Sequence, residues 1–157
     1  MVEQFFGGNA VCIVSDGGRF PLPPFVRGTL GHLPAPHRLF FGCHESDPCL
    51  VGYGSAYRKS LFADMERRRV MEEAFAPRAH HDRARRIFGF VEDVAVEEKA
   101  MVTLPPLMRR RAGIGRLALC VGTGGTFEIW DAERALSEGG RDLRELAAWH
   151  LELSQAA

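Results

Sequence analysis

A six-residue motif occurs twice in this chain of 157 residues, and it constrains the fold more than any other feature of the sequence. Residues 22–27 read Leu-Pro-Pro-Phe-Val-Arg and residues 104–109 read Leu-Pro-Pro-Leu-Met-Arg, an offset of 82. An apolar run that ends in glycine follows each copy, and a second run that ends in an aromatic residue comes next. Because these features recur in the same order, they indicate an internal duplication.

Both copies predict the same order of elements, with strands that flank a short helix led by proline. In the first copy we expect strands over 11–15, 19–23, 38–42 and 49–53, with a helix from Pro24 to a stop at Gly28 or Gly31. In the second copy we expect strands over 89–96, 101–104, 116–121 and 126–130, with helices over 105–112 and 132–137. Helical periodicity predicts three further helices, over 55–75, 78–88 and 142–154.

These elements predict an α+β fold that is mainly β, with two similar halves that pack as one unit. The expected division is a first half over 5–54, a helical connection over 55–88, a second half over 89–137 and a C-terminal helix over 138–157. On one helix, Tyr57, Leu61 and Met65 form an apolar stripe, which we expect to be exposed and to mediate assembly of several copies.

Charge alone does not decide between partners, because the 20 basic and 20 acidic residues cancel. Residues 1–125 hold an excess of four basic groups, and residues 126–157 hold an equal acidic excess. No stretch reaches the roughly 20 apolar residues that span a bilayer, and the start lacks the pattern of a secretory signal. We therefore expect a cytoplasmic protein with no membrane partner.

Several motifs that suggest chemistry have simpler interpretations. Gly122-Thr-Gly-Gly-Thr-Phe127 has the glycines of a phosphate loop, but strand-type residues follow where that loop needs a helix, which favours a hairpin. The scattered cysteines, with no C-x-x-C pair, predict free and mostly buried thiols (Cys12, Cys43, Cys49 and Cys120). His80 and His81 are adjacent, so on a helix they diverge and do not share an ion readily. With no nucleophile elbow either, the sequence predicts no metal, no cofactor and no enzyme.

The turn before the first motif is the most informative candidate site. Ser15-Asp16-Gly17-Gly18-Arg19 places an arginine directly after a tight glycine turn, at the start of a strand. A two-stranded β-ribbon fits the major groove of DNA, and an arginine fork at its tip reaches guanine or phosphate. The turn therefore predicts a contact with nucleic acid.

Several segments together resemble the MraZ family, the tandem SpoVT-AbrB-type regulators of bacterial division and cell-wall operons. The resemblance covers about residues 5–153 and is carried by Phe6-x-Gly8, 47–53, 85–89, 106–114 and 127–131. It implies two swapped-hairpin β-barrel halves per chain and ring-shaped homo-oligomers. It also implies a nucleoid-associated regulator that binds direct DNA repeats upstream of its own operon.

The family's DNA-contacting signature is D-x-x-x-R in each half, and this chain departs from it. In the first half Arg19 matches the arginine, but Ser15 stands at the acid and Asp16 comes one position late. In the second half Glu97 stands at the acid and Met101 at the arginine. Each acid is expected to orient its own turn or the arginine of that turn.

We expect Arg19 to be the principal DNA contact and Lys99, the only cation in the second turn, to be a secondary one. Arg27 and Arg109 end the two proline-led helices and are candidate helix or phosphate partners. Because one signature arginine is missing, a second hypothesis stays open. In that hypothesis the chain is a degenerate member with weak or no DNA binding that acts as an oligomeric scaffold.

Overall fold

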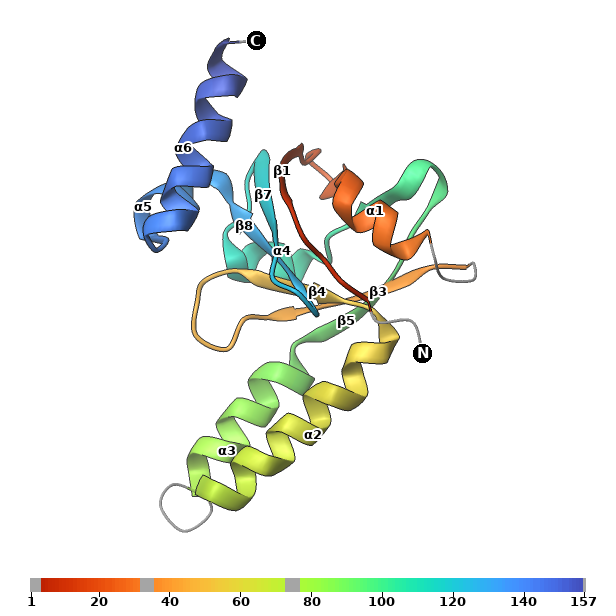
Figure 1. Ribbon diagram of the computed structural model, residues 1–157, viewed down its shortest axis with the longest axis vertical. Helices are drawn as coiled ribbons and strands as arrows, with labels where there is room; N and C mark the ends of the chain where they lie inside the picture. The colour runs from red at the N-terminus through yellow and green to blue at the C-terminus, as the bar shows by residue number, and fades with distance from the viewer. Residues whose placement is uncertain (1–3, 32–35, 73–76, 157) are drawn as a thin grey trace.

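The computed structural model describes residues 4–31, 36–72 and 77–156, and its strands form two antiparallel sheets (Figure 1). The larger sheet has six strands in the order β1-β7-β8-β4-β3-β5, and β2 pairs with β6 in a separate two-stranded ladder. The strands are β1 (Asn9–Ile13), β2 (Arg19–Pro21), β3 (Arg38–Cys43), β4 (Leu50–Tyr53), β5 (Val91–Ala95), β6 (Met101–Thr103), β7 (Leu117–Gly122) and β8 (Phe127–Asp131). The α+β class expected from the sequence is confirmed.

The helices follow the prolines and glycines of the sequence closely. They are α1 (Pro24–Leu30), α2 (Ser55–Glu72), α3 (Pro77–Ala84), the π-helical turn η1 (Arg85–Gly89), the 3-10 turn η2 (Glu98–Ala100), α4 (Pro106–Ala112), α5 (Ala132–Glu138) and α6 (Arg141–Ala156). Gly28 lies inside α1, and Gly31 caps it. The single helix expected over 78–88 is in fact α3 followed by η1. No helix in the described parts of the chain is long and apolar enough to cross a membrane.

The two copies of the repeat exchange strands. β1 of the first copy pairs with β7 of the second, β5 of the second pairs with β3 of the first, and β2 pairs with β6. Equivalent elements of the two copies begin 82 residues apart at β1 and β5, β2 and β6, and α1 and α4. The larger sheet is therefore built from both copies. That the four segments of the sequence are separate folding units stays a prediction.

Phe127 lies at the centre of the core. Its ring centroid is 5.1 Å from that of Phe6 and 6.4 Å from those of Phe25 and Phe41, so aromatic residues from both copies meet there. On the neighbouring strand, Gly52 faces the same ring, which a Cβ atom at that position would overlap. Gly52 is therefore required by close packing rather than by backbone conformation.

The apolar stripe expected on α2 does not form a free surface. Met65 is only 2% exposed, and the Tyr57 ring packs on Tyr53 with centroids 5.4 Å apart. The expectation that this stripe is exposed is therefore wrong, because it packs against the chain's own sheet and helices. The exposed apolar side chains near it belong to other faces of the helical hairpin (Phe62, Val70, Met71 and Phe88).

Replacing Gly52 by alanine is expected to lower the free energy of unfolding by about 1–3 kcal/mol, because the added methyl overlaps the buried Phe127 ring. The matched control is Gly28→Ala, since a Cβ at Gly28 meets nothing within 4 Å and Gly28 lies inside a helix. That control is expected to raise stability by about 0.5–1 kcal/mol. Urea unfolding of the two variants measures both changes, and equal stabilities would contradict the packing role of Gly52.

Candidate nucleic-acid interface

The β2·β6 ladder brings the two candidate turns to the same place in the molecule. Arg19 pairs with Thr103 and Pro21 pairs with Met101, so each strand starts where the other ends. The first turn, residues 15–18, leads into β2, and the second, residues 97–100, leads into β6. Two turns that are far apart in the sequence therefore lie on either side of one short ladder.

Equivalent backbone hydrogen bonds hold the two turns. The Ser15 amide donates to the Arg19 carbonyl at 2.9 Å, and the Glu97 amide donates to the Met101 carbonyl at 2.8 Å. In the first turn the Arg19 amide also donates to the Ser15 hydroxyl at 3.0 Å. Ser15 therefore accepts a hydrogen bond in place of the expected acid, but from the backbone of Arg19.

The second turn carries backbone strain that the first avoids. Gly18 has a φ of 88°, which glycine adopts freely, whereas Lys99 and Ala100 have φ of 59° and 57°. Non-glycine residues in this left-handed region cost roughly 1–2 kcal/mol each. Lys99 stands where the first copy has Gly17, so the second turn places a cation where a glycine would be more stable.

An ion pair joins the two turns. Arg19 Nη2 lies 3.2 Å from Glu97 Oε2, and the two side chains are 52% and 49% exposed. The acid of the second turn therefore contacts the arginine of the first, which differs from the expectation that each acid serves its own turn. At this exposure the pair contributes little to stability, but it limits the orientations of the guanidinium.

Arg109 anchors the first turn rather than facing solvent. Its Nη1 donates to the Asp16 carbonyl at 2.8 Å, its Nε to the Ile114 carbonyl at 2.9 Å and its Nη2 to the Gly115 carbonyl at 3.2 Å. All three nitrogens of the guanidinium are thus engaged with backbone oxygens. Of the two roles left open for Arg109, the structure supports that of a structural partner.

The remaining sequence-predicted residues are exposed. Asp16 and Lys99 are exposed in their turns, and Arg27 is exposed in the last turn of α1. Sequence reasoning missed Arg116, which is also exposed and whose carbonyl accepts from the Val14 amide at 2.7 Å, next to the first turn. No local motif marks Arg116, because β7 is brought beside β1 only by the strand exchange.

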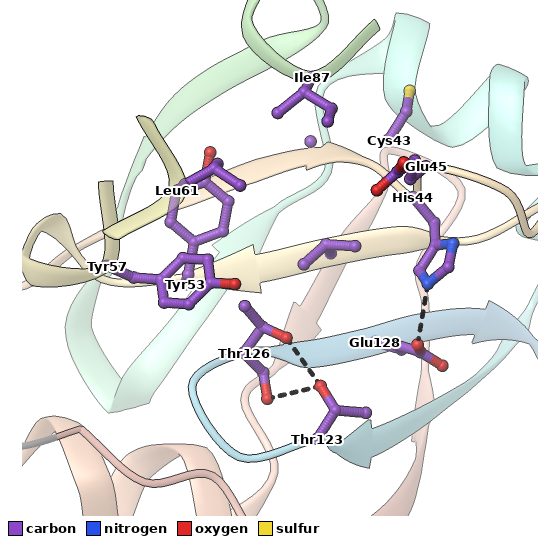
Figure 2. A pocket seen from close by; sticks show the side chains of 12 residues that line it. Cys43, His44, Glu45, Tyr53, Tyr57, Leu61, Ile87, Thr123, Thr126 and Glu128 are labelled. Carbon is purple, nitrogen blue, oxygen red and sulfur yellow. Dashed lines mark hydrogen bonds and ion pairs between the residues drawn. The ribbon is translucent and has the colours of Figure 1, made fainter. Parts of the chain in front are cut away.

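A pocket of about 300 Å³ lies on the larger sheet, where the connection after β3 meets β8, and it is a second candidate site (Figure 2). His44 Nε2 lies 3.3 Å from Glu128 Oε2, and Glu128 Oε1 accepts from the Trp130 indole at 2.9 Å. Burial raises the pKa of the Glu128 carboxyl, but the hydrogen bonds from His44 and Trp130 outweigh it and hold that pKa below its ordinary value. Cys49 completes a group whose ligand atoms all lie within 4.8 Å of one another.

The hydrogen bonds of His44 argue against metal binding at this pocket. Its Nδ1 accepts from the backbone amides of Ser46 and Asp47 at 3.1 and 2.9 Å, so the ring proton of the neutral imidazole stands on Nε2, facing Glu128. Neither ring nitrogen then offers a free lone pair to a metal ion. Burial also raises the pKa of the Cys49 thiol, which disfavours the thiolate that a metal requires.

Two further sequence predictions are settled by the structure. All four cysteines are free; three are buried and Cys43 is partly exposed, as expected. The glycine-rich segment 122–127 connects β7 to β8 as a hairpin, closed by a hydrogen bond of 2.9 Å from the Thr123 amide to the Thr126 carbonyl. The hairpin interpretation of this segment is confirmed.

The fold defines the class of protein: a duplicated α+β chain whose two copies exchange strands. Two of its turns, joined by one ion pair, form the candidate nucleic-acid interface. No protein-family model matches the sequence.

Comparison with curated proteins identifies relatives over most of the chain. A protein of Nitrosospira multiformis is 29% identical over 133 residues, which is 83% of this chain and 84% of the relative. A protein of Dehalococcoides mccartyi is 27% identical over 148 residues, 93% and 94% of the two chains, and one of Bordetella pertussis is 27% identical over 140 residues, 89% and 92%. Each of these relatives is named transcriptional regulator MraZ. The resemblance to the MraZ family is confirmed over most of the chain.

Replacing Lys99 by glycine is expected to raise the free energy of unfolding by about 1 kcal/mol, because it removes a side chain from a left-handed backbone position. The matched control is Lys59→Gly, which changes the only other lysine, inside α2, and is expected to lower stability by about 1 kcal/mol. Thermal unfolding distinguishes the two. Destabilisation by both substitutions would show that the turn is not strained at Lys99.

Proposed function

We propose that this chain is a DNA-binding transcriptional regulator of the MraZ type that binds direct repeats upstream of a division and cell-wall operon. The name shared by its relatives supports the regulatory role. Such a protein works in the cytoplasm, associated with the nucleoid.

One observation carries the proposal: Arg19 stands half-exposed at the start of β2, directly beside the second turn. Two short antiparallel strands have the width that the major groove admits, and a guanidinium donates to guanine or phosphate with two parallel hydrogen bonds. Lys99 is the exposed cation of the second turn and serves as a further phosphate contact.

The charges of the two turns predict how such binding depends on salt. Residues 15–19 and 97–101 carry three acids and two cations, so the turns themselves are not strongly basic. Arg116, which is exposed beside the first turn, supplies part of the positive charge that contact with a DNA backbone requires. Each chain then binds weakly alone, and several copies in one oligomer strengthen binding through effective concentration.

Arg19→Ala is expected to abolish preference for the DNA upstream of the chain's own operon over random DNA of equal length. The loss of a bidentate contact lowers affinity about 5- to 150-fold per site, which corresponds to about 1–3 kcal/mol. Fluorescence anisotropy across a salt series measures both affinities. The control is Arg141→Ala, an exposed arginine at the start of α6, and an Arg19→Ala variant that binds like the parent would contradict the proposal.

The scaffold hypothesis rests on a different observation, the uncharged Met101 where the second signature arginine stands in the family. A scaffold keeps the assembly but shows equal, weak binding to upstream and random DNA. The same salt series therefore distinguishes the two functions, because a regulator prefers its repeats at every salt concentration at which binding is measured.

We also propose that the two copies form swapped-hairpin β-barrel halves and that chains assemble head-to-tail into a ring. Exposed apolar side chains occur on the α2–η1 side (Phe62 58%, Phe88 38%) and on α6 (Trp149 60%, Leu153 50%). These helices project from different ends of the molecule (Figure 1). Contacts between unlike surfaces generate closed rings when the rotation closes.

Light scattering at micromolar concentration is expected to show a homo-oligomer larger than a dimer. Phe62→Asp is expected to shift it toward monomer, because it places a charge in the proposed contact. The control Leu107→Asp changes an equally exposed apolar residue, 54% exposed on α4, which is outside that surface. A monomeric parent protein would contradict the assembly and remove the contribution of multiple copies to DNA affinity.

A further inference from the structure

We propose that the acid and the arginine of the two turns act as pairs that cross between the copies, and that this chain has kept one pair, Arg19–Glu97, and lost the other, Ser15–Met101, as a unit. The inference rests on the proposed function and concerns how its DNA-contacting residue is positioned. Glu97 is then a positioning residue for Arg19, and the chain presents one oriented arginine instead of two.

The contacts of Arg19 show which acid serves it. Its guanidinium lies 3.2 Å from Glu97 of the other copy, while the hydrogen bonds of Ser15 in its own turn go to the Arg19 backbone. Arg19 and Glu97 come from turns 78 positions apart in the sequence, and the β2·β6 ladder brings them together. The acid is therefore supplied across the ladder.

Reciprocal hydrogen bonds show that the two turns are related by a pseudo-twofold arrangement. The Leu22 amide donates to the Ala100 carbonyl, and the Leu104 amide donates to the Gly18 carbonyl, both at 2.9 Å. Each bond becomes the other when the two copies are exchanged by the 82-residue offset. The same holds for the bonds that close the turns, from Ser15 to Arg19 and from Glu97 to Met101.

The same exchange converts the retained ion pair into the missing one. Position 19 becomes 101 and position 97 becomes 15, so the counterpart of Arg19 with Glu97 is Met101 with Ser15. Both positions of that second pair are uncharged. Loss of one member alone would have left an unpartnered charge beside the ladder, whereas loss of both leaves none.

An orienting carboxylate matters here because an arginine side chain has many rotamers. Holding the guanidinium before DNA arrives lowers the entropy lost when it binds. The carboxylate also offsets part of the positive charge, which reduces attraction to any phosphate. Glu97 therefore favours specific over non-specific binding rather than raising all affinities, and a residue that merely supported the fold would not have this effect.

The pairing makes a distinctive prediction about restoring the second contact. Met101→Arg alone adds a cation with no acid to orient it, so it is expected to raise affinity for upstream and random DNA by the same factor. Ser15→Asp alone adds negative charge and is expected to weaken both. The double variant is expected to raise the ratio of the two affinities about tenfold above the parent.

The experiment measures binding of the full-length chain and its variants to a duplex from directly upstream of its coding sequence and to a random duplex of equal length. The matched variant in the retained pair is Glu97→Gln, which is expected to lower the affinity ratio without lowering random-DNA affinity. The inference is overturned if the double variant changes the ratio of upstream to random affinity only by the product of the changes seen in Met101→Arg and Ser15→Asp. An unchanged ratio in Glu97→Gln overturns it as well.

A measurement without DNA separates this inference from the proposed function. Cysteines are introduced at Ser15 and Met101 in one variant and at Arg19 and Glu97 in another, and both are treated with a short bifunctional methanethiosulfonate. Single-cysteine variants are the controls, and equal intrachain cross-linking of the two double-cysteine variants supports the pairing. This result stands even if Arg19→Ala leaves DNA binding unchanged and the regulator proposal fails. Cross-linking of 19 with 97 but not of 15 with 101 overturns the pairing.

Discussion

The three-residue ladder between β2 and β6 is the interaction on which the candidate site depends. Phe20 and Val102, its central pair, are fully buried, so the ladder is anchored in the core although its ends reach the surface. Hydrogen bonds from Leu22 and Leu104 extend it by one step at each end and fix the last residue of each turn. Without this ladder, the two turns would belong to separate hairpins and Arg19 would have no partner from the other copy.

The larger sheet holds the two copies in one register. Phe127 packs against aromatic residues from the first copy, and Gly52 allows the neighbouring strand to approach its ring. His44 ties the connection after β3 to β8 through Glu128, with both ring nitrogens occupied. What first resembles a catalytic or metal-binding cluster is thus better explained as a hydrogen-bonded joint between strands of different copies.

Much of the local structure followed from the sequence. The 82-residue repeat, the prolines at the first turns of α1 and α4 and the hairpin at 122–127 have local causes, and they were predicted to within a few residues. The partner of Arg19 was not predicted, because which strand pairs with which is decided by packing between distant segments. That Glu128 lies beside His44 and Cys49 was not predicted for the same reason. The contact of Arg109 with Asp16 also joins two distant segments that no motif connects.

The exchange of strands also determines when each part of this chain can fold during synthesis on the ribosome. Cys12 of β1 pairs opposite Ala118 of β7, more than a hundred residues later, so the first half leaves the ribosome before its sheet partners are made. Until then the apolar faces of β1 and β3 stay open to water and to other nascent chains, the situation in which chaperones are needed. Duplication in one chain shortens that interval: two separate half-length chains would have to meet by diffusion, whereas here the second half arrives already tethered to the first.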